Sequence, residues 1–180
     1  MESSAWISIA SICAVGAMSP GPSLAVVIRN TIAGGRLQGV LTGVGHALGV
    51  GVYALVAVFG MALMLQQFPE AMRGIEILGG LYLLWMGYQA FQHAGEGSLD
   101  SSEDQSYRGF VDGLAISGLN PKIAVFFLAL LGPFVPVEAS HIERIGVAGL
   151  ALMIDGCWYV FVAIMLVKTG AVDWLSKQGK

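Results

Sequence analysis

Charged side chains are scarce in this chain of 180 residues, of which only 12% are Asp, Glu, Lys or Arg. A typical soluble domain contains about 25%. No charged residue occurs from Leu37 to Pro69 or from Ile77 to Gly95, and a helix that crosses a bilayer needs about 20 predominantly apolar residues. The composition therefore excludes an ordinary soluble domain and predicts an all-α, polytopic helical membrane protein.

Basic residues and catalytic motifs are also few. The chain has 9 Lys and Arg against 12 Asp and Glu, so it offers no basic surface to nucleic acid. It contains no P-loop, HExxH or GxSxG motif. Its two cysteines, Cys13 and Cys157, lie in apolar runs without zinc-ligand spacing, and we expect buried core residues rather than a disulfide. We therefore expect no enzyme, cofactor or metal, and lipid rather than nucleic acid as a partner.

Five apolar segments are long enough to span a bilayer. The first is expected to remain as a span, because it lacks the basic region of a signal peptide and its apolar run is too long for one. The predicted spans are approximately Ala5–Ile28, Leu37–Leu65, Ile75–Phe91, Phe110–Val135 and Ile145–Val167.

An acidic stretch, His93–Arg108, divides the chain near its middle. It contains Gly, Ser and four carboxylates without apolar periodicity, which is typical of a flexible linker. We expect one transmembrane domain over residues 1–180. It would comprise a first repeat (about 5–92), the linker (about 93–108), a second and incomplete repeat (about 109–168) and a short basic tail to residue 180.

The distribution of basic residues in the short loops predicts the orientation, because Lys and Arg accumulate on the cytoplasmic side. Five spans place the C-terminus in the cytoplasm. One side would carry Arg29, Arg36, Arg108, Lys168, Lys177 and Lys180, and the other only Arg73 and Arg144.

Proline interrupts two of the spans at matching places. The sequence "GAMSPGPSLAVVI" in the first and "SGLNPKIAVFFLA" in the fourth each have small residues, a polar residue, proline and then an apolar run. Paired Pro-interrupted segments indicate a transporter built from inverted repeats, whose half-helix N-termini can bind an anionic group. Ordinary proline kinks are the alternative. The repetition favours breaks that form a site.

Glycines four residues apart mark the second span, as Gly39 and Gly43 and again as Gly45 and Gly49. Small residues at this spacing let two helix backbones approach closely in lipid. We expect packing rather than ligand binding from them.

Three ionisable residues lie away from the ends of the predicted spans, where such groups are functional candidates because a charge there is costly. Lys122 follows the second break and otherwise would reach an interface by snorkelling. Asp155 is too short to snorkel, and its alternative is a structural pair with Lys122 or His46. His46 is equally compatible with a packing role and a proton-linked role. Asp112 lies near a span end, and the sequence assigns it no role.

The chain resembles the LysE/RhtB family of amino-acid exporters over nearly its whole length. The resemblance rests on "SPGPSLAVVIRNTIAGGRLQGVLTGVGHALG", "GGLYLLWMGYQAFQ", "FVDGLAISGLNPKIAVFFLALLGPFV" and Asp155 in "ALMIDGCWYVF". It implies export of an amino acid or a small derivative across the inner membrane by proton-driven antiport. We expect Asp155, with His46, to couple the proton. The expected substrate-binding residues are Pro20, Gly21, Pro22, Ser23, Asn120, Pro121 and Lys122.

Three departures from the family pattern are visible, and one of them is Gly132-Pro133-Phe134 in place of Pro-Gln-Phe. Ser23 stands where Asp or Asn is common, and a usual sixth hydrophobic segment does not follow the fifth. We expect a five-span protein or a surface covered by lipid or a second subunit. The alternatives are an exporter of another solute or a cation, and a non-transporting membrane subunit. Against a metal cargo, the spans hold one well-buried carboxylate, whereas a hard cation takes about six or more oxygens.

Overall fold

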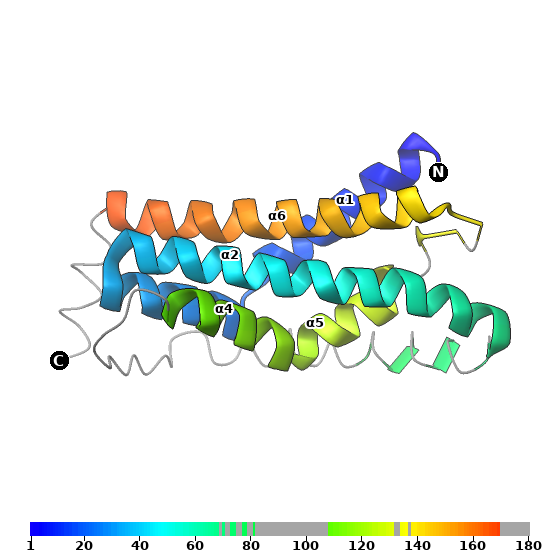
Figure 1. The fold of residues 1–180 in the computed structure, drawn as a ribbon, viewed down its shortest axis with the longest axis horizontal. Helices are drawn as coiled ribbons and strands as arrows, with labels where there is room; N and C mark the ends of the chain where they lie inside the picture. Colours follow the sequence, from blue (N-terminus) through cyan, green and yellow to red (C-terminus); the bar gives the residue numbers. More distant parts are fainter. Residues whose placement is uncertain are drawn as a thin grey trace.

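The computed structural model describes residues 1–68, 108–131, 134–136 and 138–169, together with positions 70, 73, 74, 77, 78 and 81. Every regular element within these residues is a helix, which confirms the all-α prediction. The third predicted span, nearly all of the acidic linker and the basic tail lie outside the described residues. The elements are α1 (Ser3–Met18), α2 (Pro22–Gln67), α4 (Arg108–Leu119), α5 (Pro121–Phe126), the π-helical segment η1 (Phe127–Leu131) and α6 (His141–Lys168) (Figure 1).

Both predicted breaks interrupt their helices. Ser19, Pro20 and Gly21 separate α1 from α2, and Asn120 separates α4 from α5. The backbone of Ser19 is extended, with φ −70° and ψ 131°, because the following proline ring disfavours a helical conformation at the residue before it. The first and fourth predicted spans therefore each consist of separate helical pieces, and the prediction of the breaks is confirmed.

A sharp bend at Gly35 divides α2 into a first arm, residues 22–34, and a second arm, residues 36–67. Gly35 has φ 70° and ψ −166°, a backbone conformation that glycine adopts without steric cost. The chain reverses there, so that Asn30 Nδ2 donates to Thr42 Oγ1 at 3.0 Å. A straight helix would hold two residues 23 positions apart about 35 Å from each other, yet Ser23 and His46 are in hydrogen-bond contact.

Small residues on one face of the second arm let α6 approach closely. A Cβ added to Gly39 would lie 2.9 Å from the Cβ of Ala163, and one added to Gly51 would lie 2.8 Å from Leu152 Cδ1. The residue numbers of the contacts in α6 fall as the residue numbers in α2 rise, so the two helices are antiparallel, as Figure 1 also shows. The expected packing role of Gly39 is confirmed.

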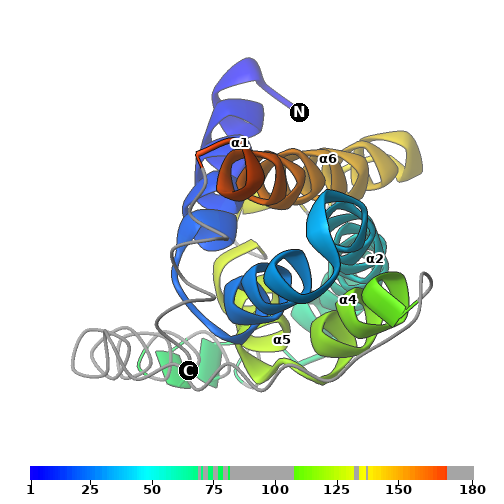
Figure 2. The same cartoon turned by 90° about the vertical axis from the view of Figure 1, so that its left-hand side faces the viewer.

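The opposite face of the second arm packs on α4 in the parallel sense. A Cβ at Gly45 would overlap the carbonyl oxygen of Phe110, and one at Gly49 would overlap the hydroxyl of Ser117. The spacing of four residues thus serves two helix–helix contacts, one with α6 and one with α4, with the second arm between them (Figure 2). Small-residue packing of this kind is typical of helices in a membrane.

The start of α6 is fixed by a capping box. Ser140 Oγ accepts from the amide of Glu143 at 3.3 Å, and the Glu143 carboxylate accepts from the amide of Ser140 at 2.8 Å. The helix then runs for 28 residues, about 42 Å, which exceeds the hydrocarbon thickness of a bilayer. Within the described residues, the segments that are long and apolar enough to cross a membrane are Pro22–Gly60 and His141–Lys168.

The outer face of α6 is apolar and exposed. Met153 is 61% exposed and Phe161 is 52% exposed, and Cys157 between them is exposed as well. The prediction that both cysteines are buried is therefore right for Cys13 and wrong for Cys157, and neither forms a disulfide. A face of this composition fits contact with lipid chains.

Basic residues collect at one end of the bundle. The bend of α2, the start of α4 and the end of α6 lie together at the left of Figure 1, which brings Arg36, Arg108 and Lys168 to that end. Arg144 lies at the start of α6, at the opposite end. We refer to the first of these as the basic end.

The two broken helices run past each other in opposite directions. Along the first arm of α2, Ser23 contacts Asn120 and Arg29 contacts Asp112. The first arm and α4 are therefore antiparallel. This is the relation that an inverted repeat requires. The full superposition of the two halves stays a prediction.

Candidate functional site

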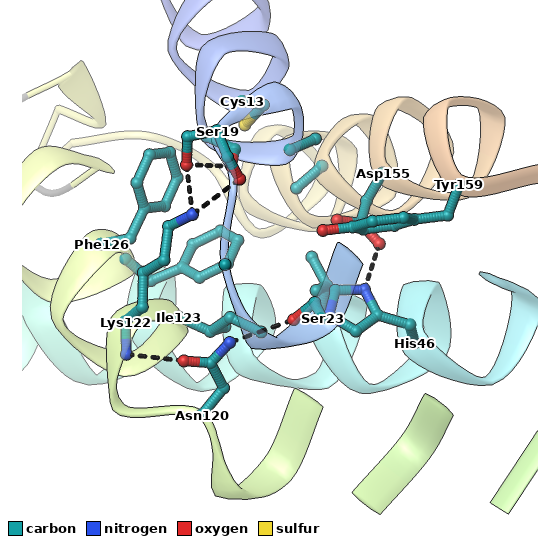
Figure 3. A pocket seen from close by; sticks show the side chains of 16 residues that line it. Cys13, Ser19, Ser23, His46, Asn120, Lys122, Ile123, Phe126, Asp155 and Tyr159 are labelled. Carbon is teal, nitrogen blue, oxygen red and sulfur yellow. Dashed lines mark hydrogen bonds and ion pairs between the residues drawn. The ribbon is translucent and has the colours of Figure 1, made fainter. Parts of the chain in front are cut away.

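The breaks of the two helices meet the second arm of α2 and α6 around a cavity of about 40 Å³, counted over positions open to the centre of a water molecule (Figure 3). It draws on elements from both halves of the chain. Its charged and hydrogen-bonding lining includes Ser19, Ser23, His46, Asn120, Lys122 and Asp155.

A chain of hydrogen bonds runs along one wall of this cavity. Asp155 Oδ2 lies 2.7 Å from His46 Nδ1, His46 Nε2 lies 2.8 Å from Ser23 Oγ, and Asn120 Nδ2 donates to Ser23 Oγ at 3.0 Å. All four side chains are buried, with exposures from 1% for His46 to 6% for Asp155. Four separate helices and breaks therefore meet in one polar network that is shielded from solvent.

The network has defined positions for a proton. When His46 is neutral with its proton on Nδ1, it donates to Asp155 and accepts from the hydroxyl of Ser23. When it is protonated on both nitrogens, it donates to both neighbours. Tyr159 holds the imidazole in place by an edge-on ring contact, with centroids 4.7 Å apart. The wall can thus store one proton without losing its hydrogen bonds.

The ammonium of Lys122 caps the end of α1 across the cavity. Its Nζ donates to the carbonyl oxygen of Ser19 at 3.0 Å, to the hydroxyl of Ser19, and to the carbonyl oxygen of Pro20 at 3.4 Å. A cation is favoured there, because the last carbonyls of a helix have no partner within the helix and carry partial negative charge. Figure 3 shows the side chain reaching from α5 to the break after α1.

The N-terminus of α5 already has a side-chain cap, whereas α2 offers backbone donors. Asn120 Oδ1 accepts from the amide of Lys122 at 3.0 Å, so this amide is occupied. In α2 the first helical hydrogen bond runs from the Ala25 amide to the Gly21 carbonyl. The amides of Ser23 and Leu24 precede that bond and have no carbonyl partner in the helix. The expectation of amide donors for a ligand at both breaks is therefore wrong for α5, where Asn120 already accepts from the Lys122 amide.

Comparisons with known proteins identify the family. The family model described as LysE type translocator matches residues 14–177. The chain belongs to the LysE family. It is 30% identical to the threonine efflux protein of Salmonella typhi over 164 residues, 88% of this chain and 80% of that protein. It is 28% identical to the leucine efflux protein of Klebsiella pneumoniae over 166 residues, 89% of this chain and 77% of that protein. No solved structure matches it.

Membership confirms the resemblance seen in the sequence, and the LysE translocators are membrane transporters. In this LysE translocator, six of the residues expected in the site line one cavity: Gly21, Ser23, His46, Asn120, Lys122 and Asp155. The remaining three are prolines at the breaks: Pro20 lies within the first break, and Pro22 and Pro121 begin the helices that follow the breaks. Asp155 pairs with His46 rather than with Lys122.

Sequence reasoning missed the aromatic lining of this cavity. Tyr159 lies one helical turn after Asp155 on α6 and covers the imidazole. The spacing of four residues, which puts two side chains on one face of a helix, was the available signal. Phe126 and Phe127, also in the lining, carried no sequence signal beyond apolarity.

A second polar cluster separates the cavity from the basic end. Arg29 donates to Asp112 Oδ2 at 3.0 Å, and Asn30 Nδ2 donates to the same oxygen at 3.1 Å and to Thr42 at 3.0 Å. These residues lie about two turns from Ser23 along the first arm, in the direction of Gly35. Asp112, which sequence reasoning left without a role, therefore links α4 to the first arm of α2, and Asn30 joins that arm to the second.

Proposed function

We propose that this LysE translocator exports an amino acid, or a small amino-acid derivative, from the cytoplasm across the inner membrane in exchange for protons. One observation carries the proposal: the buried Asp155–His46 pair and the ammonium of Lys122 line the same cavity. A zwitterion needs both an anionic and a cationic partner. A proton-driven exchanger also needs a group that binds protons where the substrate binds.

The carboxylate of the substrate binds at the break between α1 and α2. Lys122 is the nearest cation to this break, with its ammonium held by Ser19 and Pro20. The amides of Ser23 and Leu24 supply further donors at the N-terminus of the first arm, where an anion is favoured. Substrate binding would exchange the contacts of Lys122 with α1 for contacts with the carboxylate.

The ammonium of the substrate competes with a proton at the Asp155–His46 pair. Without substrate, a proton held by the pair takes the net charge of the pair from −1 to zero. When the ammonium arrives, ionised Asp155 is its partner, and the proton leaves through His46 and Ser23, which are linked at 2.8 Å. Export of one zwitterion and return of one proton then use the same carboxylate, which binds the substrate ammonium in one direction and the proton in the other.

The cavity reaches the two sides of the membrane in turn. The basic end would face the cytoplasm, with the C-terminus on that side, because basic residues accumulate there. The Arg29–Asp112 contact would close the cytoplasmic path in the state described. Lipid, or a second copy of the chain, would cover the apolar outer face of α6.

A serine hydrolase is the second candidate function, and one observation favours it. Ser23, His46 and Asp155 are hydrogen-bonded in the order that activates serine in hydrolases. In this chain, however, Asn120 also donates to the Ser23 oxygen, and Ser23 is only 4% exposed. We therefore assign the three residues to proton transfer. Covalent labelling of Ser23 by a fluorophosphonate would contradict this assignment.

Transport by the purified chain in proteoliposomes tests the main proposal. We expect wild-type protein to exchange labelled for unlabelled amino acid, and to move it against its gradient when a pH gradient is imposed. Asp155→Asn keeps the size of the side chain and removes its titration. It should retain exchange and lose accumulation driven by the pH gradient.

Glu138→Gln is the matched control, because it makes the same chemical change at an exposed position outside the cavity. It should behave as wild type. If Asp155→Asn accumulates substrate as wild type does at equal protein density, Asp155 is structural. If wild-type protein exchanges no amino acid when reconstituted alone, the chain has another cargo or is a subunit of a larger transporter.

A further inference from the structure

We propose that Phe126, seated on Gly16, sets the upper size limit of the transported side chain, so that this translocator carries small amino acids and rejects large apolar ones. The inference rests on the proposed function, because it concerns the cargo of the same cavity. It adds a residue that determines specificity, and a pair of helices, α1 and α5, whose contact sets the limit.

The cavity has a polar wall and an apolar wall. The polar wall runs from Asp155 to Asn120 and would bind the ammonium of an amino acid, while Lys122 and the break after α1 would bind its carboxylate. The other wall includes Ile123, Phe126 and Phe127. A substrate held at these two points directs its side chain toward these apolar residues. The position of the apolar wall decides how long that side chain can be.

The movement of the Phe126 ring is limited, because the tip of the ring packs against the backbone of α1 at Gly16. A Cβ added to Gly16 would be 2.5 Å from Cε2 and Cζ of this ring, so the tip of the ring occupies the place of a side chain at position 16. The ring of Phe127 meets it edge-on, with centroids 5.4 Å apart. Phe126 is 9% exposed and Phe127 is 3% exposed, which fits a wall fixed by packing.

The size of the cavity agrees with a small cargo. About 40 Å³ is room for about three water molecules at about 10–15 Å³ each, or about 90 Å³ of liquid volume. The smallest amino acids fit in such a space, whereas one with a phenyl ring requires the apolar wall to move. In Figure 3 the ring of Phe126 lies on the side of the cavity away from His46 and Asp155.

Two substitutions should move the limit in opposite directions. Phe126→Ala removes the ring and widens the cavity, and Phe126→Leu is a milder change that keeps an apolar side chain if the alanine variant folds poorly. Gly16→Ala places a methyl group where the ring tip lies and pushes the ring into the cavity. The matched controls are Phe161→Ala, on the exposed face of α6, and Gly149→Ala, where an added Cβ meets nothing within 4 Å.

The experiment is counterflow in proteoliposomes with glycine, threonine, leucine and phenylalanine at equal concentrations. Wild-type protein should prefer threonine to phenylalanine. The ratio of phenylalanine to threonine transport should rise at least about tenfold in the Phe126 variants, since about 10–200-fold discrimination accompanies each methylene in a tight pocket. In Gly16→Ala the ratio of threonine to glycine transport should fall, while both controls keep the wild-type ratios.

Different results would contradict the proposed function and the size limit. If wild-type protein gives counterflow of no amino acid, the proposed function is wrong and the size limit falls with it. If wild-type protein transports phenylalanine as well as threonine, the size limit alone is wrong. The same holds if both Phe126 variants transport threonine with an unchanged ratio of phenylalanine to threonine.

Discussion

Gly113 and Gly118 on α4 provide a sharp test of the packing between α2 and α4. A Cβ at Gly113 would overlap the carbonyl oxygen of Thr42 and lie 2.8 Å from the amide nitrogen of His46, whereas a Cβ at Gly118 meets nothing within 4 Å. Both residues are in the same helix, and both changes to alanine add one methyl group. The helix propensity gained from alanine is up to about 1 kcal/mol in each case.

The expected effects have opposite signs. Gly118→Ala should be neutral or stabilising by up to about 1 kcal/mol. In Gly113→Ala the obstacle is backbone, which cannot rotate away, so α4 must move off the second arm until the overlap with the Thr42 carbonyl oxygen is relieved and every contact is at least 3.4 Å. Overpacking of a well-packed site typically costs about 1–3 kcal/mol. The displaced backbone includes His46, so transport should fall as well.

Thermal unfolding of the two purified variants in the same detergent measures this difference. Gly113→Ala should unfold at a temperature several degrees below wild type, and Gly118→Ala at or above the wild-type temperature. Exchange of labelled amino acid in proteoliposomes then reports on the site. Equal unfolding temperatures for the two variants would refute the close approach of α2 and α4, and normal exchange by Gly113→Ala would separate His46 from that contact.

Two further predictions concern the ends of the bundle. Ser140→Ala should destabilise the protein by about 1 kcal/mol, because the amide of Glu143 loses its cap; an unfolding temperature equal to wild type would contradict the capping box. Asp112→Asn should speed the labelling of a cysteine at position 23 by a thiol reagent added at the basic end, since the Arg29–Asp112 contact no longer closes that path. The double variant Arg29→Asp with Asp112→Arg, which swaps the two side chains, should restore slow labelling. An unchanged labelling rate in Asp112→Asn would contradict the closing role.

Much of the site could be predicted from sequence because its parts are local. Proline fixes the two breaks wherever the chain folds. Likewise, the cost of burying Asp155 in a membrane makes it a candidate without any knowledge of its partner. Glycines at a spacing of four residues mark the faces that pack. These properties depend on residue type and near neighbours alone, so the sequence is sufficient to find them.

The contacts between distant segments were not predictable in the same way. The pairing of Ser23 with His46 requires the reversal at Gly35, and a shift of one residue in either arm would turn one of the two side chains away. Asp112 was left without a role because its partner, Arg29, is 83 positions away in the sequence. Such registers follow from the fit of whole helix surfaces, which no short stretch of sequence encodes.

The reversal at Gly35 also bears on how the protein is made. The chain is synthesised from its N-terminus, so both arms of α2 can enter the bilayer as a hairpin before α6 has been translated. Ser23 Oγ and His46 Nε2 are hydrogen-bonded to each other within that hairpin, at 2.8 Å. Asp155 then enters the membrane when its partner is already in place, and the cost of about 2.5–3.5 kcal/mol for inserting a lone carboxylate is offset on arrival. The order of the elements along the chain thus suits the order of their insertion.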